Sequence, residues 1–155
     1  MKPSPSDAFL VFCGGGVGAI IRVALTALFP DSAVDPLTTD PLNMFPVTML
    51  AINCAGALIL GVLTGFLNSR SGGPWVRSAR LTLGTGVLGG FTSYSSFALA
   101  LAQLGAAGQY IDALIYLVLS LFGGYLMAWS GLRWGKVLGG REHKENYFQK
   151  GRGPR

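Results

Sequence analysis

Four long runs of apolar residues, separated by polar segments, dominate the pattern of this chain. The runs cover residues 8–29, 45–67, 79–104 and 110–134. Each supplies at least the ~20 residues that a helix needs to cross ~30 Å of hydrocarbon. The pattern predicts an all-α membrane protein with four transmembrane helices and no soluble domain.

The segments outside the runs are short and polar. Residues 1–134 form one predicted membrane domain, and the first run, which lacks a signal-peptide cleavage pattern, is interpreted as a retained span. Residues 135–155 are basic and contain glycine, so we expect a disordered cytoplasmic tail there.

Composition supports the membrane class and excludes much enzyme chemistry. Only 12% of residues are charged, against ~25% in soluble domains. Cys13 and Cys54 lie inside predicted spans without disulfide or metal spacing, and His143 has no companion ligand. The hydroxyl side chains have no nearby base, so we expect the protein not to be an enzyme.

Basic residues gather on one side of the predicted membrane domain. Four spans place both termini and the second loop together, and that side carries every Lys and Arg except Arg22. The opposite side carries Asp31, Asp35, Asp40 and Asp112 and no basic residue. The positive-inside rule therefore predicts a multi-pass protein of the cell membrane with both termini cytoplasmic. Anionic lipid, and not nucleic acid, accounts for the basic tail.

The hydrophobic interior of the spans contains no Asp or Glu. Proton-coupled transporters usually need an intramembrane carboxylate, and cation pores use acidic rings, so both classes are disfavoured. Arg22 is the one charge at depth, and two interpretations of it stay open. Its side chain reaches the outer interface, or its charge draws anions toward a vestibule.

The third run has an unusual composition for a membrane helix. Four glycines, Gly84, Gly86, Gly89 and Gly90, are followed by a hydroxyl cluster, Thr92, Ser93, Ser95 and Ser96. Glycine weakens a helix, and Ser or Thr can satisfy the backbone groups that a break releases. We therefore expect a helix broken near its middle, whose carbonyls could hold a cation such as Na⁺. The alternative is a continuous helix with a small-residue packing face.

Other polar and aromatic residues inside the spans are candidates for a pathway. Tyr94 and Phe97 share a helix face, and aromatic ring edges can line a route for a small anion. Asn53 needs a partner helix or water, and Tyr116 shares a face with Ser120. Small residues four apart, Gly14/Gly18, Gly61/Gly65 and Gly86/Gly90, predict tight helix association.

These motifs together resemble the Fluc (CrcB-type) fluoride channel family over residues 12–134. The matching segments are GGVGAIIR ending at Arg22, NCAGALILG beginning at Asn53, GGFTSYSSF beginning at Gly89, and Tyr116 with Ser120. The third segment is the specific one, and the order and spacing of all four strengthen the match.

The resemblance implies a passive fluoride-selective channel that lowers cytoplasmic fluoride and is built as an antiparallel dimer with two pores. It implies a structural Na⁺ held by backbone carbonyls at Gly89 and Thr92. It implies that Asn53, Tyr94, Phe97 and Ser120 line a pore, with Ser93 and Ser96 in the hydroxyl-rich region around the break.

The chain departs from the family pattern at Tyr94, where Phe is usual, and at Ala98 and Ala100, where Ser and Glu are frequent. A phenol could change or abolish conduction, so a non-conducting structural subunit is an alternative, and a small coupled transporter is a weaker one. The charge bias favours a second homologue of opposite topology as partner over a homodimer.

Overall fold

The computed structural model describes residues 4–29, 45–70 and 73–150, with only the backbone of residues 141–150. Within these ranges all regular secondary structure is helical. Four helical segments are long and apolar enough to cross a membrane: Pro5–Leu28, Val47–Asn68, Pro74–Ala106 and Tyr110–Gly140. The prediction of four membrane-spanning helices is confirmed.

Helix α1 (Pro5–Leu28) begins slightly earlier than the apolar run because its first turn is capped. Ser4 Oγ accepts a hydrogen bond from the peptide N–H of Asp7, and the Asp7 carboxylate accepts one from the N–H of Ser4. This reciprocal arrangement is a capping box, and Pro5 fits the first helical position. Asp7 also pairs with Arg77, which ties the start of α1 to α3 (Pro74–Ala79).

The third span consists of several helical pieces. After α3 the backbone is π-helical over η3 (Arg80–Leu88), continues as α4 (Gly89–Phe91), and resumes as α5 (Tyr94–Ala106). Helix α5 ends in a Schellman turn, in which Gly108 N–H donates to the Gly105 carbonyl and Gln109 N–H to the Leu104 carbonyl. Gly108 has a φ of 74°, which glycine adopts without steric cost.

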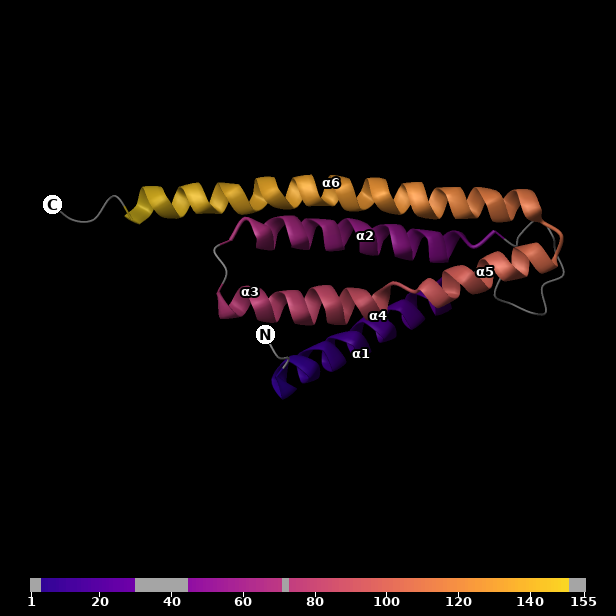
Figure 1. Cartoon of the computed structure of the whole chain (residues 1–155), viewed down its shortest axis with the longest axis horizontal. Helices are drawn as coiled ribbons and strands as arrows, with labels where there is room; N and C mark the ends of the chain where they lie inside the picture. The colour runs from indigo at the N-terminus through magenta and orange to yellow at the C-terminus, as the bar shows by residue number, and fades with distance from the viewer. Residues whose placement is uncertain (1–3, 30–44, 71–72, 151–155) are drawn as a thin grey trace.

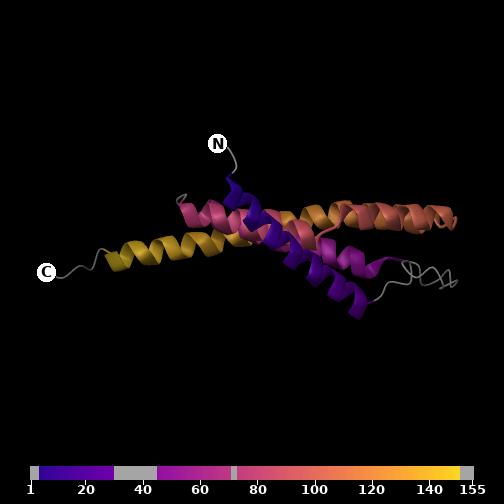
Figure 2. The same cartoon turned by 90° about the horizontal axis from the view of Figure 1, so that it is seen from below.

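The helices pack as an open layer (Figure 1). Helix α2 (Val47–Asn68) lies between α6 (Tyr110–Lys150) and the α3–η3–α4 segment. Helix α1 crosses η3 and α4 at an angle that is clearest in Figure 2. Helix α5 packs against α6.

Glycines set the closest helix contacts. A methyl group on Gly18 of α1 would collide with the carbonyl of Val87, and one on Gly61 of α2 would collide with the carbonyl of Ala128. A methyl group on Gly14, Gly65 or Gly90 would likewise collide with neighbouring backbone, and one on Gly86 would be in tight contact with it. The tight association predicted from the three small-residue pairs is therefore confirmed.

Large apolar side chains cover much of the outer surface. Phe12, Ile20 and Ile111 are each at least 70% exposed. A soluble monomer rarely shows such extensive apolar surface, whereas lipid solvates it without penalty. The protein is therefore a multi-pass membrane protein.

Helix α6 does not end at Trp134, the last residue of the predicted fourth span. It continues to Lys150, and Gly135 and Gly139 keep the first part of this extension close to the end of α2. The Ser69 hydroxyl also donates to the Lys136 carbonyl over 3.4 Å. The helix thus extends past residue 135, while the disorder of the tail stays a prediction, and residues 151–155 lie outside the described part.

Candidate functional site

An interruption separates α4 from α5 near the middle of the third span. Thr92 (ψ 151°) and Ser93 (φ −142°, ψ 109°) have extended backbone between Phe91 and Tyr94. The side chains of these two residues stabilise the adjoining helix ends. Thr92 Oγ1 donates to the Leu88 carbonyl over 2.9 Å, and Ser93 Oγ accepts from the Ser96 N–H over 3.1 Å as the N-cap of α5.

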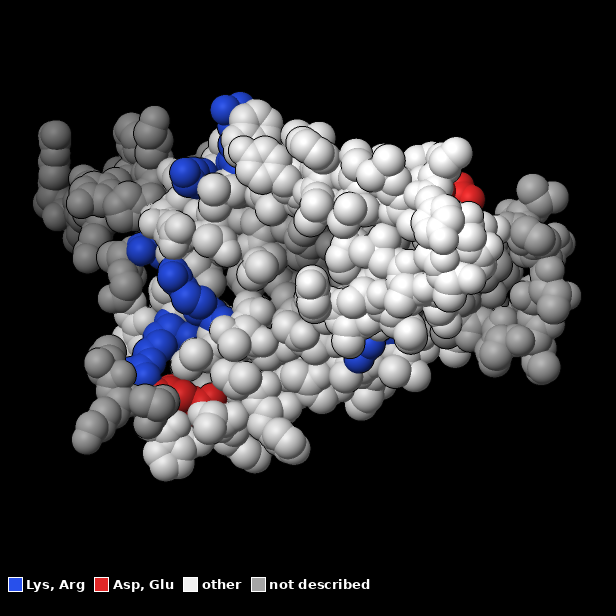
Figure 3. All heavy atoms as spheres, turned by 45° about the vertical axis from the view of Figure 1, so that its right-hand side comes forward, with Lys and Arg blue, Asp and Glu red and all other residues white. Residues whose placement is uncertain are grey.

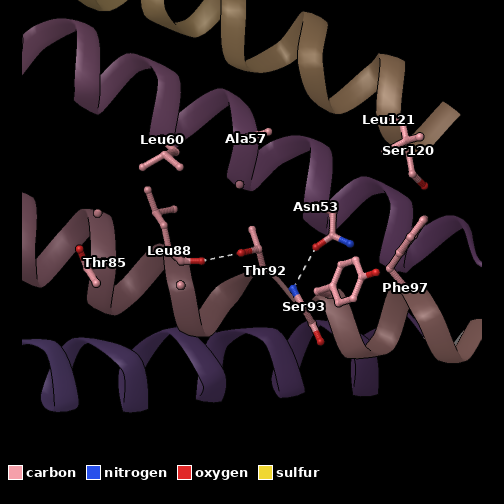
Figure 4. Close-up of a pocket in the computed structure, with 14 residues that line it drawn as sticks. Asn53, Ala57, Leu60, Thr85, Leu88, Thr92, Ser93, Phe97, Ser120 and Leu121 are labelled. Atoms are coloured by element: carbon pink, nitrogen blue, oxygen red, sulfur yellow. Dashed lines mark hydrogen bonds between the residues drawn. The ribbon is translucent and has the colours of Figure 1, made fainter. Parts of the chain in front are cut away.

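Asn53 of α2 satisfies the backbone donor that the interruption releases. Its Oδ1 accepts the peptide N–H of Ser93 over 3.1 Å (Figure 4). In a continuous helix that N–H would donate to the carbonyl of Gly89. The amide of Asn53 thus replaces a helical hydrogen bond, while its NH₂ group keeps two donors.

A groove of about 580 Å³ opens beside the interruption. Its lining comes from α2, η3, α4, α5 and α6, as Figure 4 shows for ten of the residues. The polar members are Asn53, Thr85, Thr92, Ser93, Tyr94 and Ser120; the others are Gly56, Ala57, Leu60, Gly84, Leu88, Gly89, Phe97 and Leu121. The lining contains no Asp or Glu, so the groove offers amide and hydroxyl donors without an acidic group that would repel an anion.

Aromatic rings extend in a row from the groove into the protein. The ring centroids of Tyr94 and Phe97 are 5.9 Å apart, and those of Phe97 and Tyr116 are 5.5 Å apart. Tyr94 is 82% exposed, whereas Tyr116 is fully buried in a core with Ala100 and Leu104. The row is therefore accessible at Tyr94, whereas Tyr116 belongs to the packed core.

Ser120 brings a hydroxyl from α6 to the groove. Its Oγ is buried and has no hydrogen-bond partner among the described residues. A buried hydroxyl without a partner is costly in an apolar setting. A ligand, a water molecule or a second chain in the groove could accept a hydrogen bond from this hydroxyl or donate one to it.

Arg22 lies outside the groove lining. Its Nε donates to the Gly90 carbonyl over 3.3 Å, on the α1 side of the interruption. The guanidinium thus binds backbone next to the interruption, and an anion-attracting vestibule role for its charge stays a prediction. Ser96 also lies outside the lining, and its hydroxyl exchanges a 2.8 Å hydrogen bond with Ser93 Oγ.

Comparison with known proteins places this geometry in a family. The family model for CrcB-like proteins (Camphor Resistance, CrcB) matches residues 9–132, which is most of the chain. The chain belongs to the CrcB-like family. The fluoride-specific ion channel FluC of Novosphingobium aromaticivorans is 40% identical over 122 residues, covering 79% of this chain and 90% of that protein.

Two further CrcB-like relatives have similar names and coverage. The fluoride-specific ion channel FluC of Deinococcus radiodurans is 41% identical over 128 residues, covering 83% of this chain and 90% of the relative. Fluoride-specific ion channel FluC 1 of Cutibacterium acnes is 37% identical over 121 residues, covering 77% and 78%. The resemblance inferred from the motifs is thus confirmed at the level of the family.

The structure gathers most of the candidate residues at one place. Asn53, Ser93, Tyr94, Phe97 and Ser120 line the groove, and so do Gly89 and Thr92, the residues expected to offer carbonyls to Na⁺. That these residues line a conducting pore stays a prediction, and so does the binding of Na⁺ at Gly89 and Thr92.

Sequence reasoning missed several parts of the groove. Thr85, Gly56 and Leu60 line it, and a methyl group on Gly56 would collide with Thr92 Cγ2. Gly56 lies three residues after Asn53 and therefore on the same face of α2, a spacing that could have indicated its place. Thr85 belongs to the π-helical stretch, whose register a 3.6-residue period does not give.

Proposed function

We propose that this protein is a subunit of a fluoride-selective passive channel that exports fluoride and lowers its cytoplasmic concentration. The observation that carries the proposal is the interruption at Thr92–Ser93, capped by Asn53 and open to a groove lined by neutral donors. Fluoride holds its water strongly, so a pathway must replace that water with N–H groups, hydroxyls and ring edges. The names of the relatives support the choice of fluoride among small anions.

An antiparallel partner subunit would cover the groove. The polar groups of the half-buried Asn53 and Thr92 and of the exposed Tyr94 lie within a membrane-spanning layer, where contact with lipid is unfavourable. A second chain placed against this face would exclude lipid and enclose a path between the two. The similarity to the family supports a two-fold, inverted arrangement.

A structural Na⁺ would fit the same interruption. The N–H of Ser93 donates to Asn53, which leaves the carbonyl of Gly89 without its usual helical donor. Carbonyl oxygens suit a hard cation, and Gly89 and Thr92 both lie on the groove side. When bound, the ion would supply positive charge that holds two copies of the interruption together.

The distribution of charge supports cytoplasmic termini and a separate partner. Among described residues other than Arg22, the basic side chains gather at one end of the molecule (Figure 3). These side chains are Arg70, Arg77, Arg80, Arg133 and Lys136. Arg141, Lys144 and Lys150 are described only in backbone. The other charged residues of this prediction, Lys2, Arg152, Arg155, Asp31, Asp35 and Asp40, lie outside the described residues. If the chain inserts into the membrane in one orientation only, an antiparallel dimer would require a partner homologue whose Lys and Arg residues lie at the opposite end.

A topology reporter fused to the C-terminus tests this orientation. We expect reporter activity only on the cytoplasmic side when the chain is expressed alone. A substantial fraction with the C-terminus outside would instead identify a dual-topology homodimer.

One feature favours a second candidate, a structural subunit whose own pore does not conduct. The phenol of Tyr94, highly exposed at the groove, adds a polar group where the family usually has a phenylalanine edge. Fluoride efflux from liposomes separates the two candidates. Efflux through this chain alone supports a conducting subunit; efflux only with a partner, and unchanged by Tyr94→Ile, supports a structural one. Proton-coupled uptake would support the weaker alternative of a transporter.

A further inference from the structure

Arg22 contacts the interruption from α1, a helix that contributes no residue to the groove lining. Its Nε donates to the Gly90 carbonyl over 3.3 Å, and the two residues are 68 positions apart in the chain. Arg22 is partly buried, which is unusual for a charge in an apolar span. The contact therefore needs an explanation within the fold.

Glycine packing brings this arginine within reach of Gly90. A methyl group on Gly90 would collide with the carbonyl of Gly15 and would also lie very close to the backbone nitrogen of Ala19. A methyl group on Gly18 would collide with the carbonyl of Val87. Gly15, Gly18, Ala19 and Arg22 follow a spacing of three, four and seven, so they share one face of α1.

The interruption releases four carbonyls, those of Gly89, Gly90, Phe91 and Thr92, whose helical donors would have been the N–H groups of Ser93 to Ser96. Arg22 takes one of them, Gly90. Gly89 and Thr92 instead belong to the groove lining. Gly90, whose carbonyl Arg22 binds, thus faces α1, whereas Gly89 and Thr92 contact the groove.

We propose that Arg22 is a positioning residue of the channel proposed above, on which this inference rests. Its guanidinium holds the Gly90 carbonyl toward α1 and so fixes the last turn of α4 with Gly89 and Thr92 facing the groove. Asn53 performs the matching task from α2 by binding the N–H of Ser93. Side chains from two helices therefore hold the two sides of the interruption.

This role differs in a measurable way from attraction of anions by the arginine charge. Attraction acts on the local fluoride concentration, so higher fluoride compensates for its loss. Positioning acts on the backbone at the interruption, so its loss loosens residues 91–97 and weakens the proposed Na⁺ site at any fluoride concentration.

The test compares hydrogen exchange and fluoride efflux in the purified, assembled protein carrying Arg22→Met or Arg80→Met. Arg80 donates to Asn68 Oδ1 at the end of α2, outside the groove, so Arg80→Met removes the same charge elsewhere. A hydrogen bond from a charged group contributes enough that we expect exchange of amides 91–97 to rise about tenfold or more in Arg22→Met. We also expect efflux to need more Na⁺ in that variant. Arg80→Met should change neither.

Unchanged exchange in Arg22→Met, with an efflux defect that higher fluoride restores, would overturn the proposal and identify an anion-attracting charge. Exchange is measured without conduction, so failure of the wild-type protein to release fluoride would count against the channel and not against this role. If Arg22→Met does not fold, solid-state NMR on the wild-type protein decides. A dipolar contact between Arg22 Nε and the Gly90 carbonyl carbon is expected, and its absence would overturn the proposal.

Discussion

The amide of Asn53 accepts the peptide N–H of Ser93 over 3.1 Å, joining the middle of α2 to the point where the third span stops being helical. The hydrogen bond stabilises a backbone that would otherwise leave a donor unpaired in an apolar environment. It also fixes the Asn53 NH₂ group at the groove. One side chain therefore supports the fold and supplies donors to the proposed path.

Replacing Asn53 with leucine should abolish this support. Asn53→Leu keeps a similar volume but leaves the Ser93 N–H without an acceptor, a loss of about 1–3 kcal/mol. We expect fluoride efflux from liposomes to fall by between about fivefold and about 150-fold, since a tenfold change corresponds to ~1.4 kcal/mol. Asn68→Leu, at the end of α2 away from the groove, is the control and should release fluoride at the wild-type rate. Equal rates for both variants would remove Asn53 from the pathway.

Glycine substitutions should separate tight from open packing. Gly61→Ala places a methyl group against the Ala128 backbone, and such overpacking costs about 1–3 kcal/mol. Gly16→Ala, which meets nothing within 4 Å, should leave stability unchanged or raise it through helix propensity. The stability of both variants is measured by thermal unfolding in detergent, with size-exclusion chromatography as the detection of folded protein. A Gly61→Ala protein as stable as the wild type would contradict the α2–α6 packing described here.

If the pore that Tyr94 lines conducts, the edge of the Tyr94 ring should contribute to fluoride conduction. Tyr94→Phe keeps the edge, so we expect efflux close to the wild-type rate. Tyr94→Ile removes it, and a loss of about 0.5–1.5 kcal/mol would slow efflux about three- to tenfold. Tyr110→Ile, another exposed tyrosine at the start of α6, is the matched control. Wild-type efflux in Tyr94→Ile would instead favour a structural subunit.

Removal of Na⁺ should affect the channel without any mutation. Protein purified and reconstituted with N-methylglucamine in place of Na⁺, at constant ionic strength, should lose efflux and regain it when Na⁺ returns. The reason is that the carbonyls at the interruption would repel one another without a cation between them. Efflux that persists after exhaustive exchange would rule out the proposed site at Gly89 and Thr92.

The sequence predicts much of this architecture, for reasons that are local. Apolar runs of sufficient length give the four spans, and glycines four apart give the close helix pairs, because both signals depend on neighbouring residues. The pairing of Asn53 with Ser93 joins residues 40 positions apart through a single side chain, so no periodicity reports it.

Other parts of the site depend on register, which composition does not determine. The π-helical turns of η3 rotate Thr85 into the groove, and an α-helical period misses that rotation. Ser93 and Ser96 look equivalent in the sequence, yet Ser93 caps α5 and lines the groove while Ser96 bonds to Ser93. Arg22 could be placed at depth from its sequence position, but its acceptor lies on another helix.

Electrical recording of the assembled protein in a planar bilayer shows whether it conducts fluoride passively and selectively. With a fluoride gradient and equal chloride on both sides, we expect a current whose reversal potential shifts about 59 mV per tenfold change in fluoride. Absence of current, or a reversal potential that follows chloride, would contradict the account.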